Sequence, residues 1–265
     1  MKYPSARRPL PFLFALLLLT AAAHLPLAAT PLSRMDLPWW RARHEAVLDR
    51  IRQGHVGLIL LGDSITEDWE RRGPPDWADF RLGWEHFYGG RDAVNMGFTG
   101  DTTAHLLWRI ENGEVDSIAP KVAVILIGAN NLGRVHWSAA DTVAGIEADV
   151  AAVRRRLPRT KILLLSVLPS ERSAWVSETT AEINRALAQR FGQASGPSGG
   201  DVTYLDLTSV FMRDGRLDRD LFLDPKMSPP RPPLHPSPEG QARMAAAMEP
   251  TLARLMGDKE RSAGR

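Results

Sequence analysis

The stretch Leu58-Ile59-Leu60-Leu61-Gly62-Asp63-Ser64-Ile65-Thr66 indicates the fold of this chain. Its uninterrupted apolar run is typical of a strand that is buried on both faces of a parallel sheet. The run ends at Gly62, and Ser64 follows two residues later. Because ligand sites of open α/β sheets lie beyond the carboxyl ends of their strands, we expect Ser64 to act as a nucleophile. Alternatively, Asp63 and Ser64 only cap the next helix, since both residue types are preferred N-caps.

The rest of the chain alternates between predicted strands and predicted helices. Apolar runs predict four more strands, at residues 93–96, 121–127, 161–167 and 202–207. Helical patterns cover residues 38–53, a segment that ends near 112, and residues 138–156, 176–192 and 238–256. Residues 70–91 and 192–200 are predicted to be surface loops, the first with some helix. This alternation predicts a single α/β domain whose parallel sheet is covered by helices on both faces.

Composition narrows the class of protein. The chain has 265 residues, a formal net charge of +2 and no cysteine. Without cysteine there can be no disulfide bond and no thiolate metal site. No run of Lys and Arg stands out, so we expect no nucleic-acid partner.

The N-terminus has the pattern of a secretory signal peptide. A positive region with Lys2, Arg7 and Arg8 precedes an apolar run at 10–23, and small residues follow at 21–23 and 27–29. We therefore expect residues 1–29 to be removed and the protein to be secreted or periplasmic, without a stable membrane anchor. The alternative is an anchor, for which the apolar run is short. The folded domain is predicted at 36–257, with a frayed tail at 258–265.

Four separated segments place small or polar residues at strand ends or before the last helix. They contain Ser64, Gly100, Asn130 and His235. Acyl transfer needs a nucleophile, a base and hydrogen-bond donors for the developing oxyanion. Ser64 can be the nucleophile and His235 the base, while the Gly100 backbone and the Asn130 side chain can donate. Each residue also has a plainer interpretation. Ser64 can be a helix cap, Gly100 a turn glycine, Asn130 a cap or turn residue, and His235 a surface histidine.

These blocks, in this order, resemble those of the SGNH or GDSL-type hydrolases. The matching blocks are Gly62-Asp63-Ser64-Ile65, Gly100, Gly128-Ala129-Asn130 and His235. The resemblance spans about residues 55–255, and residues 100–114 and 128–131 look closest to the catalytic subunits of platelet-activating-factor acetylhydrolase. Secreted bacterial carbohydrate acetylesterases are similar too. The resemblance implies a flavodoxin-like three-layer α/β/α sandwich with strand order 2-1-3-4-5, ester hydrolysis, and no metal or organic cofactor.

The resemblance also implies a role for each residue. Ser64 is the nucleophile, and its own N–H joins the Gly100 N–H and the Asn130 side chain in an oxyanion hole. His235 is the general base and then the general acid. By analogy with the acetylhydrolase subunits, the protein is compatible with a homodimer.

An insertion separates the expected aspartate from the histidine. The family usually has its aspartate three residues before the histidine, but here that position is Pro232. We interpret residues 225–232 as an insertion that bulges outward, so that Asp224 still orients the imidazole of His235. Alternatively, Asp224 is displaced, and a backbone carbonyl or a water molecule holds the ring.

Residues beside the catalytic groups predict the substrate. Ile65, Ala129 and Leu234 are candidates for the acyl pocket, and the bulk of Ile65 and Leu234 favours an acetyl group. Tryptophans in or near the loops above the sheet offer rings that either stack on sugars or pack in the core: Trp69, Trp77, Trp84, Trp137 and Trp175. Export favours a small-molecule or glycan ester as the substrate. The alternatives are a lipid-directed esterase or lysophospholipase, and a non-catalytic glycan-binding module.

Overall fold

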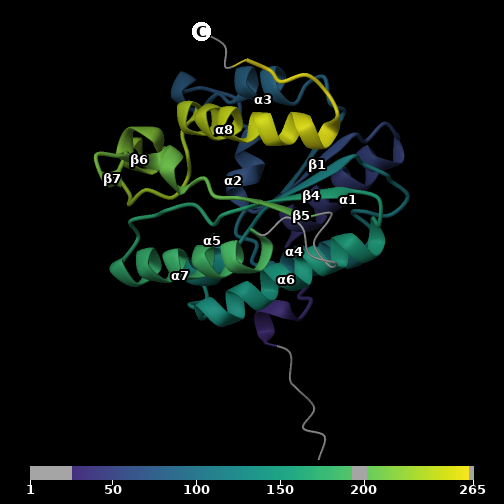
Figure 1. Ribbon diagram of the computed structural model, residues 1–265, viewed down its shortest axis with the longest axis horizontal. Helices are drawn as coiled ribbons and strands as arrows, with labels where there is room; N and C mark the ends of the chain where they lie inside the picture. The colour runs from purple at the N-terminus through teal and green to yellow at the C-terminus, as the bar shows by residue number, and fades with distance from the viewer. Residues whose placement is uncertain (1–25, 193–201, 263–265) are drawn as a thin grey trace, which may run out of the picture.

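A central sheet with helices on both faces forms the fold (Figure 1). The computed structural model describes residues 26–192 and 202–262. Within these residues the main sheet has five parallel strands in the order β2-β1-β3-β4-β5. The strands are β1 (Leu58–Gly62), β2 (Ala93–Gly97), β3 (Val122–Leu126), β4 (Lys161–Leu165) and β5 (Val202–Leu205). The predicted α/β/α sandwich with strand order 2-1-3-4-5 is confirmed.

The longer helices form the two outer layers. One face carries α1 (Pro38–Arg52), α4 (Thr103–Glu111), α6 (Ala139–Arg156) and α7 (Ala174–Phe191). The other face carries α3 (Arg81–Phe87) and α8 (Pro238–Met256). Figure 1 shows α3 and α8 on one side of the sheet and α6 and α7 on the opposite side. The short helices α2 (Ser64–Glu67) and α5 (Ala129–Gly133) begin just after β1 and β3.

Two apolar clusters separate the layers. Ile59 and Leu61 belong to the cluster beneath α1, α4, α6 and α7. Leu58 and Leu60 belong to the cluster beneath α3 and α8. Because successive side chains of a strand point to opposite faces, a strand covered on both sides needs an apolar residue at every position. This explains the uninterrupted apolar run of β1.

The strand register brings three loops to one edge of the sheet. Gly62, the last residue of β1, pairs with Gly97 at the end of β2 and with Leu126 at the end of β3. The three strands therefore end at one level. The segments 63–66, 98–102 and 127–130 leave the sheet at this edge, where ligand sites of such folds lie.

Residues 70–91 contain the 3-10 helix η3 (Asp76–Ala78) as well as α3, in agreement with the prediction of some helix there. Trp69 is only 2% exposed and packs edge-on against Phe80 and Tyr88, so it belongs to the core. A short antiparallel hairpin that the sequence did not indicate, β6 (Met212–Arg213) with β7 (Arg216–Leu217), follows β5. The remaining 3-10 helices are η1 (Leu27–Ala29), η2 (Asp68–Glu70), η4 (Thr208–Phe211), η5 (Arg219–Leu221) and η6 (Asp224–Lys226). Residues 193–200 of the predicted loop at 192–200 lie outside the described residues.

Residues 26–34, which we call the N-terminal strap, pack against α4 and α6. Ala28 is fully buried, and its carbonyl accepts a hydrogen bond of 2.7 Å from the Thr103 hydroxyl. The packed part of the chain thus begins before residue 36. Residues 1–25 of the predicted signal peptide lie outside the described residues, whereas residues 26–29 belong to the strap. Removal of the peptide stays a prediction. Within the described ranges, no helix is long and apolar enough to cross a membrane.

The chain after α8 is docked as far as residue 262. Asp258 accepts hydrogen bonds from Nε (2.8 Å) and Nη2 (3.0 Å) of Arg91, and the Arg261 N–H donates to Glu249 at 2.8 Å. Arg91 is buried and also binds both carboxylate oxygens of Glu249. The expectation of a frayed tail is therefore wrong for residues 258–262, because a buried guanidinium requires carboxylate partners.

Candidate active site

Ser64 is the first residue of α2, immediately after the end of β1. The cap of this helix is Asp63, whose Oδ1 accepts a hydrogen bond of 3.0 Å from the Ile65 N–H. The Ser64 hydroxyl is therefore not needed as a cap. Its oxygen lies 3.1 Å from Nε2 of His235, although the two residues are 171 positions apart in the chain.

Asp224 lies behind the imidazole in spite of the insertion. Its Oδ1 is 2.9 Å from Nδ1 of His235, while its Oδ2 accepts hydrogen bonds from the N–H groups of Leu234 (2.8 Å) and His235 (2.6 Å). Residues 228–232 of the insertion are exposed and bulge away from these contacts. The alternative in which Asp224 is displaced does not agree with this geometry. Ser64, His235 and Asp224 thus form a continuous hydrogen-bonded chain.

Asp224 and His235 shift each other's pKa. Burial lowers the pKa of the His235 imidazole, but the hydrogen bond and the charge of Asp224 outweigh burial and raise it above 6.5. Burial raises the pKa of Asp224, but the hydrogen bonds from the side chain and backbone of His235 outweigh it and lower the pKa below 3.8. Asp224 therefore stays ionised and stabilises the imidazolium.

The three predicted donors lie on segments that leave the sheet at the same edge, where β1, β2 and β3 end. Gly100 has a φ of +77°, a left-handed conformation that favours glycine, and within the described residues its N–H has no acceptor. The Ser64 N–H opens a helix, where the first amide groups have no carbonyl partner inside the helix. Asn130 Nδ2 donates to the Asp101 carbonyl at 3.0 Å and makes a longer contact of 3.4 Å with Asp63. The Asp101 carbonyl thus holds one hydrogen of this amide, and the other makes only the longer contact with Asp63.

Further carboxyl groups lie near the imidazole. Burial raises the pKa of Asp63 to about 7 and that of Asp68 to about 6. The charge of each raises the pKa of His235 further. One carboxyl oxygen of Asp68 is buried without a hydrogen-bond partner among the described residues. No group of three or more His, Asp or Glu side chains placed to hold a metal ion occurs in residues 26–192 and 202–262.

A buried ion network that the sequence did not reveal supports the loops of the site. Arg109 on α4 is fully buried and donates to Asp101 (2.8 Å), to Glu114 (2.5 Å) and to the carbonyl of Gly62 (3.0 Å). The Asp101 carboxylate also accepts the indole N–H of Trp40 at 2.9 Å. Arg109 thereby ties the end of β1 to the segment that carries Gly100. A charged residue on the buried face of an amphipathic helix was the available signal in the sequence.

The three acyl-pocket candidates lie on the same side of the sheet. Ile65 is 1% exposed and Ala129 is 6% exposed, and both belong to the apolar cluster beneath α8. Leu234 packs against this cluster and is half-buried. Ile65 and Ala129 are therefore core residues behind the site, and only Leu234 retains appreciable exposure.

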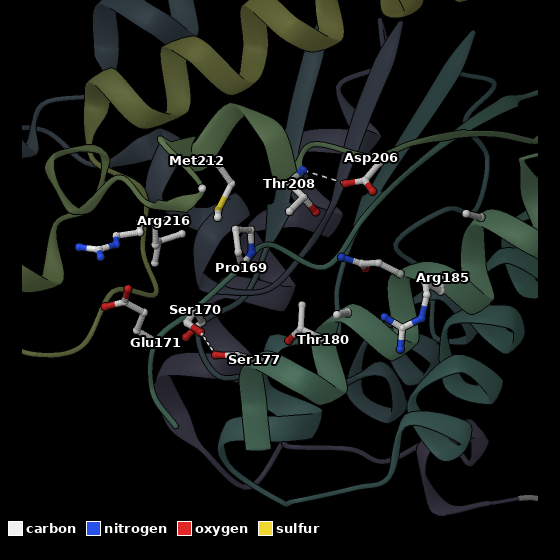
Figure 2. Close-up of a pocket in the computed structure, with 15 residues that line it drawn as sticks. Pro169, Ser170, Glu171, Ser177, Thr180, Arg185, Asp206, Thr208, Met212 and Arg216 are labelled. Carbon is white, nitrogen blue, oxygen red and sulfur yellow. Dashed lines mark hydrogen bonds between the residues drawn. The ribbon is translucent and has the colours of Figure 1, made fainter. Parts of the chain in front are cut away.

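A groove of about 620 Å³ lies between α7 and the β6–β7 hairpin (Figure 2). None of Ser64, His235 and Asp224 lines it. It adjoins the site through Ser170, whose hydroxyl donates to the Pro233 carbonyl at 2.9 Å. Polar and charged side chains are frequent in its wall: Ser177, Thr180, Arg185, Asp206, Thr208 and Arg216.

Comparisons with known proteins show which family the sequence matches. Residues 60–243 match the model of the GDSL-like Lipase/Acylhydrolase family. The chain is 31% identical over 187 residues to the platelet-activating factor acetylhydrolase IB subunit alpha2 of Rattus norvegicus, which covers 69% of this chain and 74% of that protein.

Solved structures show the same fold. A carbohydrate esterase family 3 protein from Talaromyces cellulolyticus has a TM-score of 0.56 and 18% identity, and the match covers 77% of this chain and all of that one (100%). A carbohydrate acetylesterase family member from Sinorhizobium meliloti has a TM-score of 0.54 and 18% identity, and the match covers 76% of this chain and 99% of that one. At these identities the likeness concerns the fold.

Proposed function

Because the chain belongs to the GDSL-like lipase/acylhydrolase family and is a carboxylic ester hydrolase, we propose that it hydrolyses acetyl esters of carbohydrates through Ser64, His235 and Asp224. The observation that carries the proposal is the hydrogen-bonded chain from the Ser64 hydroxyl through the imidazole to Asp224, with spacings of 3.1 and 2.9 Å. This is the arrangement of nucleophile, base and orienting carboxylate that acyl transfer uses on several unrelated folds.

The first half of the reaction forms an acyl-enzyme. The Ser64 oxygen attacks the carbonyl carbon of the ester while Nε2 of His235 takes the hydroxyl proton. The ester C–O bond then breaks, and the imidazolium gives its proton to the leaving alcohol. In the second half, His235 deprotonates a water molecule that attacks the acyl-enzyme, and the acid leaves as the serine regains its proton.

The oxyanion of each tetrahedral intermediate is stabilised by three donors. These are the N–H groups of Ser64 and Gly100 and the hydrogen of the Asn130 amide that makes the longer contact with Asp63. The Asp101 carbonyl holds the other amide hydrogen, so the donor is oriented before substrate arrives. Such preorganised donors are worth about 10²–10³ in rate each, since they need no rearrangement as charge develops.

The apolar residues at the site support a short acyl group. Ile65 and Ala129 are packed into the core, which favours acetyl over a long chain. The acetylhydrolase named among the relatives is in keeping with this. The predicted signal peptide favours a secreted or periplasmic glycan ester, whereas the acetylhydrolase relative is the reason to keep a lipid ester as the second candidate. A homodimer, by analogy with that relative, remains part of the proposal.

Ester hydrolysis assays test the proposed function. We expect hydrolysis of p-nitrophenyl acetate and of acetylated xylan, and loss of both activities in Ser64→Ala. Acetyl esters should be preferred over decanoyl esters by more than about tenfold in kcat/KM. Comparable rates on both chain lengths would favour the lipid-directed alternative. Unchanged hydrolysis by Ser64→Ala would refute the catalytic assignment.

A further inference from the structure

Arg172 is a partly buried guanidinium beside the site without a carboxylate partner. Its Nη2 donates to the Ala129 carbonyl (2.8 Å) and its Nε lies 3.2 Å from the Ser170 hydroxyl, both neutral acceptors. Among the described residues no carboxylate lies within ion-pair distance of it, although the charges of Asp63 and Asp224 act on it from farther away. Burial lowers the pKa of Arg172, because a desolvated charge without a partner is unfavourable.

Helix α5 makes room for this guanidinium. A Cβ atom at Gly133 would lie only 1.5 Å from Nη1 of Arg172, so the arginine crosses α5 where a side chain is missing. Nη1 has no hydrogen-bond partner in residues 26–192 and 202–262, and it is not among the buried unpartnered atoms. Nη1 of Arg172 is therefore an unpaired donor that reaches solvent beside the helix that begins at Ala129 and Asn130.

Arg134, the residue after Gly133, adds a second unpaired cation at the C-terminal end of α5. It is exposed, and within the described residues its guanidinium makes no hydrogen bond or ion pair. Its Nη1 is 2.9 Å from the position that a Cβ at Gly100 would occupy, so the charge lies beside the proposed oxyanion hole. Arg34, which also approaches Gly100, differs because its charge is already neutralised by Asp101 at 2.9 Å.

An aromatic pair joins the segments that follow Arg134 and Arg172. The rings of His136 and Trp175 are stacked, with centroids 5.2 Å apart and an angle of 25° between their planes. Trp175 is 39% exposed. His136 is two residues from Arg134, and Trp175 is three residues from Arg172. A partly exposed indole on a segment that also carries Arg172 can add a flat apolar surface to anion-binding donors.

We propose that Arg134 and Arg172 bind the carboxylate of an acidic sugar whose acetyl ester is cleaved at Ser64, while Trp175 packs against the sugar ring. This inference rests on the proposed function and specifies its substrate class as acetylated acidic carbohydrates. A carboxylate fits because Arg172 offers a planar edge of N–H donors and because neither guanidinium is neutralised by a neighbouring acid. The aromatic face favours a sugar over the headgroup of a lipid.

A matched pair of substrates tests the inference: an O-acetylated methyl galacturonoside and the corresponding O-acetylated methyl galactoside, which differ by one carboxylate. We expect the wild-type enzyme to prefer the acidic ester by at least about tenfold in kcat/KM, mainly through KM. Arg134→Gln and Arg172→Lys should each reduce this preference several-fold, because lysine lacks the planar pair of donors. Rising salt should weaken the contribution of the exposed Arg134.

Arg185→Gln is the control, because Arg185 is an exposed arginine on the same helix as Trp175 and lies in the groove of Figure 2. It should leave the ratio of the two rates unchanged. Equal rates on the two sugars, or Arg134→Gln with an unchanged ratio, would overturn the inference while leaving the esterase intact. So would a preference for an acetylated phospholipid over both sugars. Failure to cleave any ester, p-nitrophenyl acetate included, would instead remove the proposed function itself.

Discussion

Replacing Asp224 by asparagine tests whether the insertion-separated aspartate orients the imidazole. Its two oxygens have different partners: Oδ2 accepts the N–H groups of Leu234 and His235, and Oδ1 faces Nδ1 of the ring. An asparagine carbonyl must take the place of Oδ2, because an NH₂ group there would oppose two N–H donors. The amide nitrogen then faces Nδ1, which forces this atom to accept a hydrogen bond.

The forced tautomer is the wrong one for catalysis. If Nδ1 accepts, the proton of the neutral ring resides on Nε2, and Nε2 cannot receive the proton of the Ser64 hydroxyl. Loss of the same orienting carboxylate from a serine triad lowers kcat by about 10⁴, or about 5.5 kcal/mol at 1.36 kcal/mol for each factor of ten. We expect a fall of this order for Asp224→Asn with p-nitrophenyl acetate.

The pH dependence gives a second readout. His235 must be neutral to act as a base, so kcat/KM of the wild type should rise with pH through the pKa of His235, which is above 6.5. In Asp224→Asn the hydrogen bond and charge that raise this pKa are lost, while burial, which lowers it, remains. The acidic limb should therefore move to lower pH. A fall in kcat of less than tenfold, with an unmoved limb, would refute the reasoning.

Three further outcomes concern stability, measured by urea unfolding. Arg109→Leu leaves Asp101 and Glu114 buried without their shared cation, so the free energy of unfolding should fall by about 3–5 kcal/mol, and an unchanged midpoint would contradict the network. Burial raises the pKa of Asp149 well above 3.8 in the folded state. As pH rises above 3.8, the carboxyl ionises in the unfolded chain but stays protonated in the folded protein. The free energy of unfolding therefore falls by up to about 1.4 kcal/mol per pH unit. Asp149→Asn should therefore gain stability relative to the wild type between pH 4 and pH 8, and a gap that does not grow with pH would contradict the assignment. In a chain that keeps residues 26–34, Thr103→Val removes the hydroxyl that donates to the Ala28 carbonyl of the strap and accepts from Asn131, and should cost about 1–3 kcal/mol, whereas no loss would show that neither contact contributes.

Several parts of the fold and site are encoded in local sequence. The strand β1 is recognisable because burial on both faces requires an unbroken apolar run. The strand ends are recognisable because small and polar residues follow each run. Since parallel strands present their carboxyl ends at one edge, this local pattern predicts that Ser64, Gly100 and Asn130 come together, and the register of β1, β2 and β3 places their loops at that edge.

Tertiary structure decided what depends on distant partners. Asp224 reaches the imidazole because the residues between them bulge outward, and no local pattern states how a proline-rich insertion turns. The sequence can mark Arg109 as a charge on a buried helix face, but its ion network joins segments far apart in the chain, so its partners are defined only by the folded structure. Arg172 became a candidate binding group only when it was placed over Gly133. Periodicity reports which face of an element is buried, whereas the pairing of charges is a property of the assembled core.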